Sequence, residues 1–259
     1  MTDVKHVDGG PANADCAFEC TDLRLRYLHQ RTEALAGISL AVPRGAICGL
    51  FGRNGAGKTS LMALLAGLRR PSGGSVRVFG EDPWENARIA PQVAFVFPKS
   101  NSDAIINSII ARDLLRMGAF FRPNWDADFA EHLFKRFDVP LKKSAAKMSQ
   151  GQAAALRCAV GLAARAPLTI FDEAYLGMDA VYRKIFIDEL LADYLAHPRT
   201  ILFSTHYIAE MERLFSEAII IDAGQVLLHD DADTLRERGK TLQDLFIGLT
   251  LKEGENYDN

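Results

Sequence analysis

Long apolar runs, plentiful cysteine and an excess of charge of one sign are all missing from this sequence of 259 residues. Its apolar runs, such as Ala218–Ile221, fall far short of the roughly 18–20 residues that a membrane-spanning helix needs. We therefore expect that the chain does not cross a membrane by itself. The 30 basic and 33 acidic residues leave a net charge of −3, so the composition indicates no contact with nucleic acid or with an anionic membrane surface.

Cysteine is scarce, with four residues at positions 16, 20, 48 and 158. This number is too small for a disulfide scaffold in a chain of this length, which favours a reducing, cytoplasmic compartment. Cys16 and Cys20 have the spacing of a metal-binding pair, but no second Cys or His pair with ligand spacing follows, so we expect no metal there. The first 15 residues lack an apolar stretch, which predicts a disordered polar tail over 1–17 rather than a signal peptide.

Short apolar runs alternate with longer stretches of helical spacing, a pattern typical of an α/β fold. Each run is expected to form a strand that is buried on both faces of a mostly parallel sheet. The expected strands are Ala46–Phe51, Val93–Phe97, Leu168–Phe171, Ile201–Phe203 and Ala218–Ile221. The helices expected to cover them include Ser60–Leu68, Ala153–Ala164 and Val181–Leu195.

Further strands are expected near both ends of the chain. Phe18–Leu28 and Ile38–Val42 are predicted to pair as a hairpin in a small antiparallel sheet. Asp222-Ala223-Gly224 predicts a hairpin turn before a strand at Gln225–Leu228, and Thr241–Leu251 is expected to form a closing helix.

Between about residues 98 and 164 no run has the pattern of a strand. Ile105–Phe121 and Trp125–Phe137 instead have helical periodicity, which predicts an inserted helical subdomain over 98–164. The chain length suits one large domain or two smaller ones. We expect one folded domain at 18–251, followed by a polar tail at 252–259.

The strongest chemical signal follows the run Ala46–Phe51. The segment Gly52-Arg53-Asn54-Gly55-Ala56-Gly57-Lys58-Thr59 fits the P-loop pattern, with a strand expected before it and a helix that contains Ser60 after it. Its glycines let successive backbone amides point at phosphate oxygens, and the helix adds its positive N-terminal end. Lys58 can reach the terminal phosphates and the Thr59 hydroxyl can coordinate Mg²⁺, so the segment predicts phosphate binding.

Two carboxylates follow another buried run. Leu168–Phe171 leads directly into Asp172 and Glu173, and open parallel sheets bind their ligands beyond the carboxyl ends of the strands. Both acids are therefore expected beside the P-loop, Asp172 as a ligand of Mg²⁺ through water and Glu173 as the base that deprotonates the attacking water. Without the P-loop, two solvated loop acids would be the simpler interpretation.

A histidine follows a third run. His206 comes directly after Thr200–Phe203 and Ser204-Thr205, at the C-terminal end of an expected strand. This position predicts a hydrogen bond from His206 to the γ-phosphate or to the attacking water. The other five histidines lack such a position, and we interpret them as structural or solvated.

A family resemblance rests on these motifs together. Met148-Ser149-Gln150-Gly151-Gln152 opens a helix about twenty residues before Asp172, the order and spacing found in ATP-binding cassette (ABC) ATPases. The chain resembles that family from about Phe18 to Leu251. The resemblance identifies Ser149, Gly151 and Gln152 with the signature motif, whose serine lies at a helix N-cap and faces a phosphate. Taken alone, this segment is equally compatible with an ordinary capped helix.

Smaller matches extend the resemblance. Leu176-Gly177-Met178-Asp179 resembles the D-loop and carries Asp179. Tyr27, 25 residues before Gly52, resembles the aromatic residue that stacks on adenine, although a strand tyrosine can also be a plain core or surface residue. The segments most similar to bacterial exporters of the antibiotic-resistance type are Arg122-Pro123-Asn124-Trp125-Asp126 and Thr241-Leu242-Gln243-Asp244-Leu245-Phe246.

Two positions depart from the family pattern. Pro98 stands where the family has a glutamine that contacts Mg²⁺, and proline offers neither a side-chain ligand nor a backbone N–H. The contact with Mg²⁺ is then made by Lys99, by Ser100 or by a water molecule, or it is absent. Ala174 replaces the proline that usually follows the catalytic glutamate, and Tyr175 is expected to pack where that ring would lie.

The resemblance implies an ATP hydrolase that uses ATP with Mg²⁺, with Glu173, His206 and Lys58 as catalytic residues. It implies the nucleotide-binding subunit of an ABC transporter, an exporter by the details above, at the cytoplasmic face of the cell membrane. Each nucleotide in this family is enclosed by two subunits, so a second ATPase subunit is implied, in a homodimer or alternatively a heterodimer, together with a separate transmembrane subunit. No direct contact with nucleic acid is expected.

Two alternative functions stay open. A soluble ABC ATPase that acts on nucleic acid or ribosomes usually has two cassettes, long coiled coils or zinc modules, and a basic surface, none of which the sequence contains. A purely regulatory nucleotide-binding protein would have lost catalysis, with Pro98 as the mark of that loss. Measurable turnover of ATP would reject the second alternative.

Overall fold

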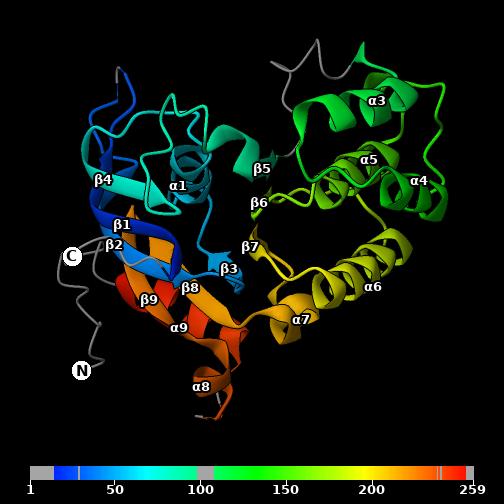
Figure 1. The fold of residues 1–259 in the computed structure, drawn as a ribbon. Helices are drawn as coiled ribbons and strands as arrows, with labels where there is room; N and C mark the ends of the chain where they lie inside the picture. Colours follow the sequence, from blue (N-terminus) through cyan, green and yellow to red (C-terminus); the bar gives the residue numbers. More distant parts are fainter. Residues whose placement is uncertain (1–14, 29, 98–107, 238, 240, 255–259) are drawn as a thin grey trace. The chain divides into compact units, whose positions relative to one another are not determined.

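The computed structural model describes residues 15–28, 30–97, 108–237, 239 and 241–254, which form two compact units (Figure 1). The first unit combines Met1–Ala90 with Thr200–Asn259, and the second is Pro91–Arg199. The chain thus enters the second unit after the first ninety residues and returns from it at Thr200.

The first unit contains a three-stranded antiparallel sheet in the order β2-β1-β4. Its strands are β1 (Cys16–Leu25), β2 (Leu35–Pro43) and β4 (Gly73–Val78). Phe18 of β1 lies opposite Val42 on one side and Val78 on the other. The predicted hairpin is therefore confirmed, but β4 was not predicted, because its two glycines and its exposed Ser75 and Arg77 leave only a short apolar alternation.

The same unit contains four further strands in the order β7-β3-β8-β9. They are β3 (Ile47–Phe51), β7 (Thr200–Ser204), β8 (Glu217–Asp222) and β9 (Gln225–Asp231). β3 pairs in parallel with both β7 and β8, and β3 and β7 are buried along their whole length. β8 and β9 form an antiparallel hairpin, whose turn residues Ala223 and Gly224 have φ values of 45° and 76°, as a tight two-residue hairpin turn requires.

Helices complete the first unit. α1 (Lys58–Leu65) follows β3, and the C-terminal part contains α7 (Ile208–Met211), α8 (Ala232–Glu237) and α9 (Leu242–Gly254), with a 3₁₀ turn at Glu212–Leu214. α9 packs against α7, α8 and β8.

The expected polar tails begin and end at slightly different residues. β1 starts at Cys16, two residues inside the tail predicted over 1–17, because its backbone already pairs with Pro43. α9 continues to Gly254 and so includes the first residues of the tail predicted at 252–259. Residues 1–14 and 255–259 lie outside the described residues.

Among its described residues, the second unit contains two parallel strands and four helices. The strands are β5 (Val93–Val96), preceded by a 3₁₀ turn at Ala90–Gln92, and β6 (Leu168–Asp172). The helices are α3 (Ala111–Phe121), α4 (Ala127–Arg136), α5 (Gln150–Ala163) and α6 (Ala180–Ala196), with a 3₁₀ turn at Ala145–Lys147. α5 contacts the other three of these helices and both strands, so it is the centre of this unit.

The helix predicted at Ile105–Phe121 is interrupted at Ile110 in the structure. Ile110 forms an isolated antiparallel bridge with Ser144, and α3 begins only at Ala111, whose N–H donates to the carbonyl of Lys143. Because Ile110 adopts an extended conformation for this bridge, the helix cannot continue through it. Residues 98–107 lie outside the described residues.

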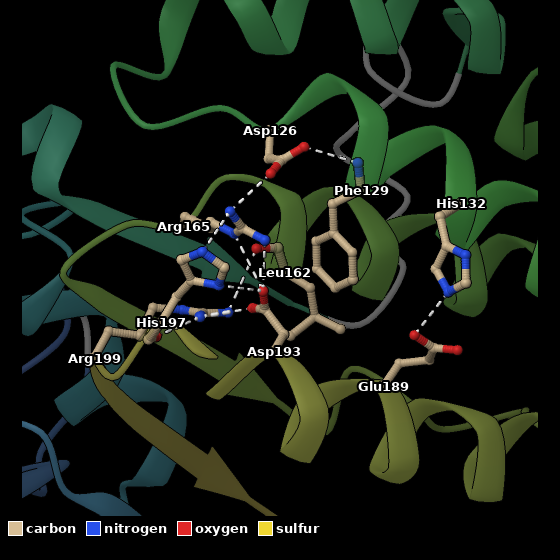
Figure 2. A network of polar contacts seen from close by, with 9 residues as sticks. All are labelled: Asp126, Phe129, His132, Leu162, Arg165, Glu189, Asp193, His197 and Arg199. Atoms are coloured by element: carbon tan, nitrogen blue, oxygen red, sulfur yellow. Dashed lines mark hydrogen bonds and ion pairs between the residues drawn. The ribbon is translucent and has the colours of Figure 1, made fainter. Parts of the chain in front are cut away.

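A buried network of charged side chains joins three helices of the second unit (Figure 2). Asp193 on α6 accepts hydrogen bonds from Arg165 Nε and Nη2 at 3.1 and 2.9 Å, and its second oxygen lies 2.7 Å from Arg199 Nη1. Arg165, which follows α5, also pairs with Asp126 at 2.7 Å. Asp126 caps α4 by accepting from the N–H of Phe129. The Arg165 guanidinium, paired with the carboxylates of Asp126 and Asp193, therefore holds the ends of α4, α5 and α6 together.

This network predicts an unequal effect of two substitutions on α6. Asp193→Ala removes a side chain that is 1% exposed and leaves the guanidinium of Arg199, itself 5% exposed, without that carboxylate, so we expect the free energy of unfolding to fall by about 3–5 kcal/mol. Lys184→Ala removes an exposed pair with Asp188 and should cost no more than about 0.5 kcal/mol. Equilibrium urea unfolding measures both. Equal effects would show that the network contributes no more than a surface pair.

Candidate nucleotide site

The P-loop lies between β3 and α1, as the sequence predicts. Gly57, which directly precedes the first helical residue, has a φ of 106°, and a Cβ built there would lie 2.6 Å from the carbonyl oxygen of Ala34. A Cβ on Gly52 would lie 2.5 Å from the carbonyl oxygen of Ile221. Both positions therefore require glycine, at Gly57 for two reasons, since L-residues with side chains rarely adopt that φ.

The Lys58 side chain is buried against the backbone of the P-loop. Its side chain is 6% exposed, and Nζ donates to the carbonyls of Gly52 at 2.7 Å and Arg53 at 3.2 Å. The ammonium group is thus turned toward the first half of the P-loop. A buried ammonium beside backbone amides and a helix N-terminus favours an anion at this place.

The turn between β8 and β9 braces the P-loop. The N–H of Gly224 donates to the carbonyl of Ala56 at 3.1 Å, and the carbonyl of Gly224 accepts from Ala36 of β2 at 2.8 Å. The P-loop backbone is therefore connected through one glycine to the hairpin and to the antiparallel sheet.

A cavity of about 590 Å³ opens on the first half of the P-loop. Its walls are formed by Gly52–Ala56, His206, Asp222, Ala223 and Phe246. The structure thus places His206 at the P-loop, while its hydrogen bond to a phosphate or to water stays a prediction. Asp222 and Phe246 were not predicted, and only the backbone pairing of β8 and the packing of α9 bring them here.

Tyr27 lies near the first turn of α1. Its hydroxyl is 2.9 Å from Ser60 Oγ, and the guanidinium of Arg69 lies over its ring at 4.7 Å from the centroid. The ring is half-buried, with a cation on one face. Stacking of adenine on Tyr27 stays a prediction, and a purine would have to share the ring with Arg69 or use its other face.

The two acids predicted to follow β6 belong to the second unit. Asp172 is the last residue of β6 and is 2% exposed, whereas Glu173 is half-buried and has a φ of 45°. A positive φ is strained for a non-glycine residue and often marks a functional position. Tyr175 is buried and packs against Phe186 at a ring distance of 6.0 Å, while the neighbouring Ala174 is also buried.

The predicted signature serine is the N-cap of α5. Ser149 Oγ accepts from the N–H of Gln152, and the Gln152 side chain accepts from the N–H of Ser149, which together form a capping box. Gly151 faces Gly177, whose carbonyl oxygen would lie 3.1 Å from a Cβ at Gly151. Asp179 caps α6 in the same way, by accepting from the N–H of Tyr182 at 2.9 Å.

The candidate residues are therefore divided between the two units. The P-loop, Tyr27 and His206 belong to the first unit, and Ser149, Gly151, Gln152, Asp172, Glu173 and Asp179 belong to the second. Their joint action stays a prediction. Pro98, which stands at the family's glutamine position, lies outside the described residues.

The residues fit a nucleotide that carries its own magnesium ion. Across the described part of the chain, no group of three or more His, Cys, Asp and Glu side chains could hold a metal ion. Mg²⁺ commonly takes only one or two protein ligands and completes its shell with phosphates and water. A P-loop threonine and a buried aspartate match that mode of binding.

A P-loop between a buried strand and a helix, within an α/β fold, defines a nucleotide-binding protein of the P-loop class. Comparison with known proteins identifies the family within that class. The family described as ABC transporter matches residues 35–176, more than half of the chain. This chain belongs to the ABC transporter family, as one of its ATP-binding and ATP-hydrolysing subunits, which use ATP with Mg²⁺.

Individual relatives agree with this assignment. "ABC transporter ATP-binding protein NatA" of Bacillus subtilis is 27% identical over 90% of this chain and 97% of its own length. "Nod factor export ATP-binding protein I" of Ralstonia nicotianae is 32% identical over 78% of this chain and 63% of its own length. "Zinc uptake system ATP-binding protein ZurA" of Listeria innocua is 27% identical over 76% of this chain and 79% of its own length.

Solved structures show the same fold. The "Structure of ATP binding subunit of ABC transporter" has a TM-score of 0.77 and 25% identity, and the match covers 90% of this chain and 99% of that one. A dimeric ATP-binding cassette bound to ADP and Pi has a TM-score of 0.72 and 17% identity over 83% of this chain and 98% of that one. Among the described residues, no helix combines the length and the apolar character needed to span a bilayer.

Gly45, before β3, and Gly57, in the P-loop, both have a positive φ, but we expect different consequences when each is replaced. Gly45 has a φ of 80° and open space where a Cβ would lie, with no atom within 4 Å, whereas Gly57 also lacks space. Gly45→Ala should lower the free energy of unfolding by about 1–2 kcal/mol and leave nucleotide affinity unchanged. Gly57→Ala should in addition weaken Mg-ATP binding by at least about tenfold, because the loop must shift. Titration calorimetry and thermal unfolding measure these effects, and wild-type affinity in Gly57→Ala would contradict the role of the loop.

Proposed function

We propose that this chain is the ATPase subunit of an exporter, which closes with a second copy around ATP and drives a separate membrane subunit at the cytoplasmic face of the membrane. One observation carries the proposal: each chain has both a P-loop with an open cavity and a capped helix start at Ser149. These are the two half-sites that the family resemblance joins across a dimer. The export direction is supported by the 32% identity to a Nod factor export protein, against 27% to a zinc uptake protein.

In this proposal the first unit holds the nucleotide. Backbone amides of the P-loop donate to phosphate oxygens, Lys58 balances the terminal phosphate charge and Tyr27 stacks on the adenine. His206 donates a hydrogen bond to the terminal phosphate from the wall of the cavity. Mg²⁺, when bound with ATP, neutralises part of the phosphate charge, and Thr59 and Asp172 are the residues proposed to hold it.

Glu173 is the proposed general base. Its carboxylate accepts the proton of the attacking water, and its position directly after a buried strand limits how far that carboxylate can move. The φ of 45° at Glu173 is consistent with a side chain whose direction is set by a turn and not by continuation of β6.

Ser149 and Asp179 act toward the second copy in this proposal. The Ser149 hydroxyl and the first amides of α5 face a phosphate bound by the partner, where the helix dipole favours negative charge. The proposed contact with the membrane subunit involves the segment 98–107, which lies outside the described residues.

The role of Glu173 is tested by Glu173→Gln. The amide still accepts a hydrogen bond and orients water but takes no proton, so turnover should fall by about 10²–10⁴-fold while Mg-ATP affinity is kept. Sedimentation should then show an ATP-dependent dimer, because hydrolysis no longer opens the closed dimer. Glu131→Gln, at an exposed position on α4, is the matched control and should hydrolyse ATP normally. Near-normal turnover in Glu173→Gln would contradict the assignment of Glu173 as the general base.

The shared site is tested by mixing two inactive variants. Lys58→Ala removes the phosphate cation from one half-site, and Ser149→Arg blocks the other with a bulky side chain whose charge repels Lys58. Each homodimer should be inactive, whereas a mixed dimer places both changes in one site and leaves the other intact, so mixing should restore up to about a quarter of wild-type turnover by statistical pairing, given full exchange of subunits. Labelled subunits establish that exchange occurs. No recovery after exchange would argue for two independent sites.

A further inference from the structure

The segment Thr241–Phe246 has no part in the proposed function so far. It begins α9, and its last residue, Phe246, lies in the wall of the cavity that opens on the P-loop. Phe246 brings a large apolar ring to this cavity, and its side chain is half-buried. An apolar ring at this place has no evident function in binding phosphate by itself.

The start of α9 is held firmly in the first unit. The Thr241 hydroxyl donates to Asp244 Oδ2 at 2.7 Å and accepts from the N–H of Asp244 at 3.0 Å. The N–H of Leu242 donates to Glu212 Oε1 at 2.8 Å, and the Leu242 side chain is fully buried. The position of Phe246, one turn further on, is therefore determined by a fixed helix start.

The hydrogen bond between Leu242 and Glu212 also connects the start of α9 to the segment that follows His206. Glu212 directly follows α7, α7 begins two residues after His206, and α9 packs against α7. Arg236 of α8 adds a hydrogen bond to the carbonyl of Phe215 at 2.8 Å. His206 and Phe246 thus line one cavity, and α7, which follows His206, contacts α9, which carries Phe246.

The lining of the cavity and the direction of Lys58 indicate that the cavity would receive the terminal phosphate of a bound nucleotide. Lys58 Nζ is turned toward Gly52 and Arg53, both of which line the cavity, and a P-loop lysine reaches the terminal phosphates. Asp222 also lines the cavity, and its charge opposes a phosphate, whereas that of Arg53 favours one. Exclusion of water strengthens every one of these electrostatic interactions.

We propose that Phe246 is a positioning residue of the nucleotide site: its ring shields the terminal phosphate of bound ATP from bulk water, and α9 is thereby stabilised when the cavity is filled. The inference rests on the proposed function, because it requires the cavity to receive the terminal phosphate. It adds a residue of α9 to the nucleotide site that the proposed function builds from the P-loop, Tyr27 and His206.

The first test measures affinity in the full chain with Mg²⁺ present. Phe246→Ala should weaken binding of the non-hydrolysable analogue AMP-PNP by about tenfold, the loss expected when one large apolar contact is removed, and should weaken ADP binding by less than about threefold. Phe246→Leu, which keeps an apolar side chain, should restore most of the affinity for AMP-PNP. Ile247→Ala is the matched control, because Ile247 is the next residue of α9, is 43% exposed and does not line the cavity.

The second test is hydrogen exchange of the α9 amides, which a merely structural role of Phe246 would not link to the nucleotide. AMP-PNP should slow exchange over 242–251 in the wild type and in Ile247→Ala, and ADP should slow it less. Phe246→Ala, checked for an unchanged circular dichroism spectrum, should lose the effect.

The outcomes separate this inference from the proposed function. The role of Phe246 is overturned if Phe246→Ala binds AMP-PNP with wild-type affinity. It is also overturned if AMP-PNP does not change hydrogen exchange in α9 of the wild type. Neither result contradicts nucleotide binding by the chain. If the wild-type chain binds neither nucleotide, the proposed function is wrong and this inference with it. If Phe246→Ala does not fold, the smaller loss expected for Phe246→Leu decides: a loss of affinity that is greater for AMP-PNP than for ADP supports the inference, and no difference between the two nucleotides overturns it.

Discussion

The nucleotide site depends on one backbone hydrogen bond, from the N–H of Gly224 to the carbonyl of Ala56. Three of the eight P-loop residues are glycines, which contribute no side chain to hold the shape of the loop. Its conformation must therefore be set by what surrounds it. The turn of the β8–β9 hairpin supplies that support, and Ile221, near the end of β8, approaches Gly52 so closely that no Cβ fits. The shape of a loop that would bind phosphate by backbone amides therefore depends on the hairpin beside it.

Two of the candidate functional groups of the second unit are helix caps. Ser149 and Asp179 each accept a hydrogen bond from the third residue of the helix that they precede, α5 and α6. A serine hydroxyl that accepts in this way still has its own hydrogen to donate to a phosphate. An aspartate at position 149 would cap the helix equally well, but its charge would repel the phosphate. The cap requirement and the proposed phosphate contact are therefore both met by serine and by few other residues.

Much of the fold followed from the periodicity of the sequence, because fully buried strands such as β3 and β7 contain apolar residues with almost no interruption. Helix starts were less predictable from this periodicity. α5 and α6 begin where Ser149 and Asp179 cap them, whereas the apolar periodicity begins one to three residues later. β4 escaped prediction because two glycines open it and only alternate residues are buried.

The parts of the site that escaped prediction are those that depend on contacts between distant segments. Phe246 lies 190 residues after Ala56, and nothing in its local sequence indicates that it lines the same cavity. The network around Asp193 likewise joins residues from positions 126 to 199, each of which looks like an ordinary surface charge in the sequence. The P-loop and the capped helix start were predictable because each is a contiguous segment whose chemistry is local.

The left-handed conformation of Glu173 restricts which residues this position can accept, apart from any catalytic need. Asparagine, aspartate and glycine tolerate a positive φ most readily, while β-branched residues are strongly disfavoured there. Position 173 is therefore constrained twice, once by the backbone and once by the proposed catalytic role, and the two constraints favour different residues. In a chain that no longer hydrolysed ATP, only the requirement for a carboxylate would be lost, and the backbone requirement would stay. Asparagine or glycine at this position would then indicate that loss of hydrolysis.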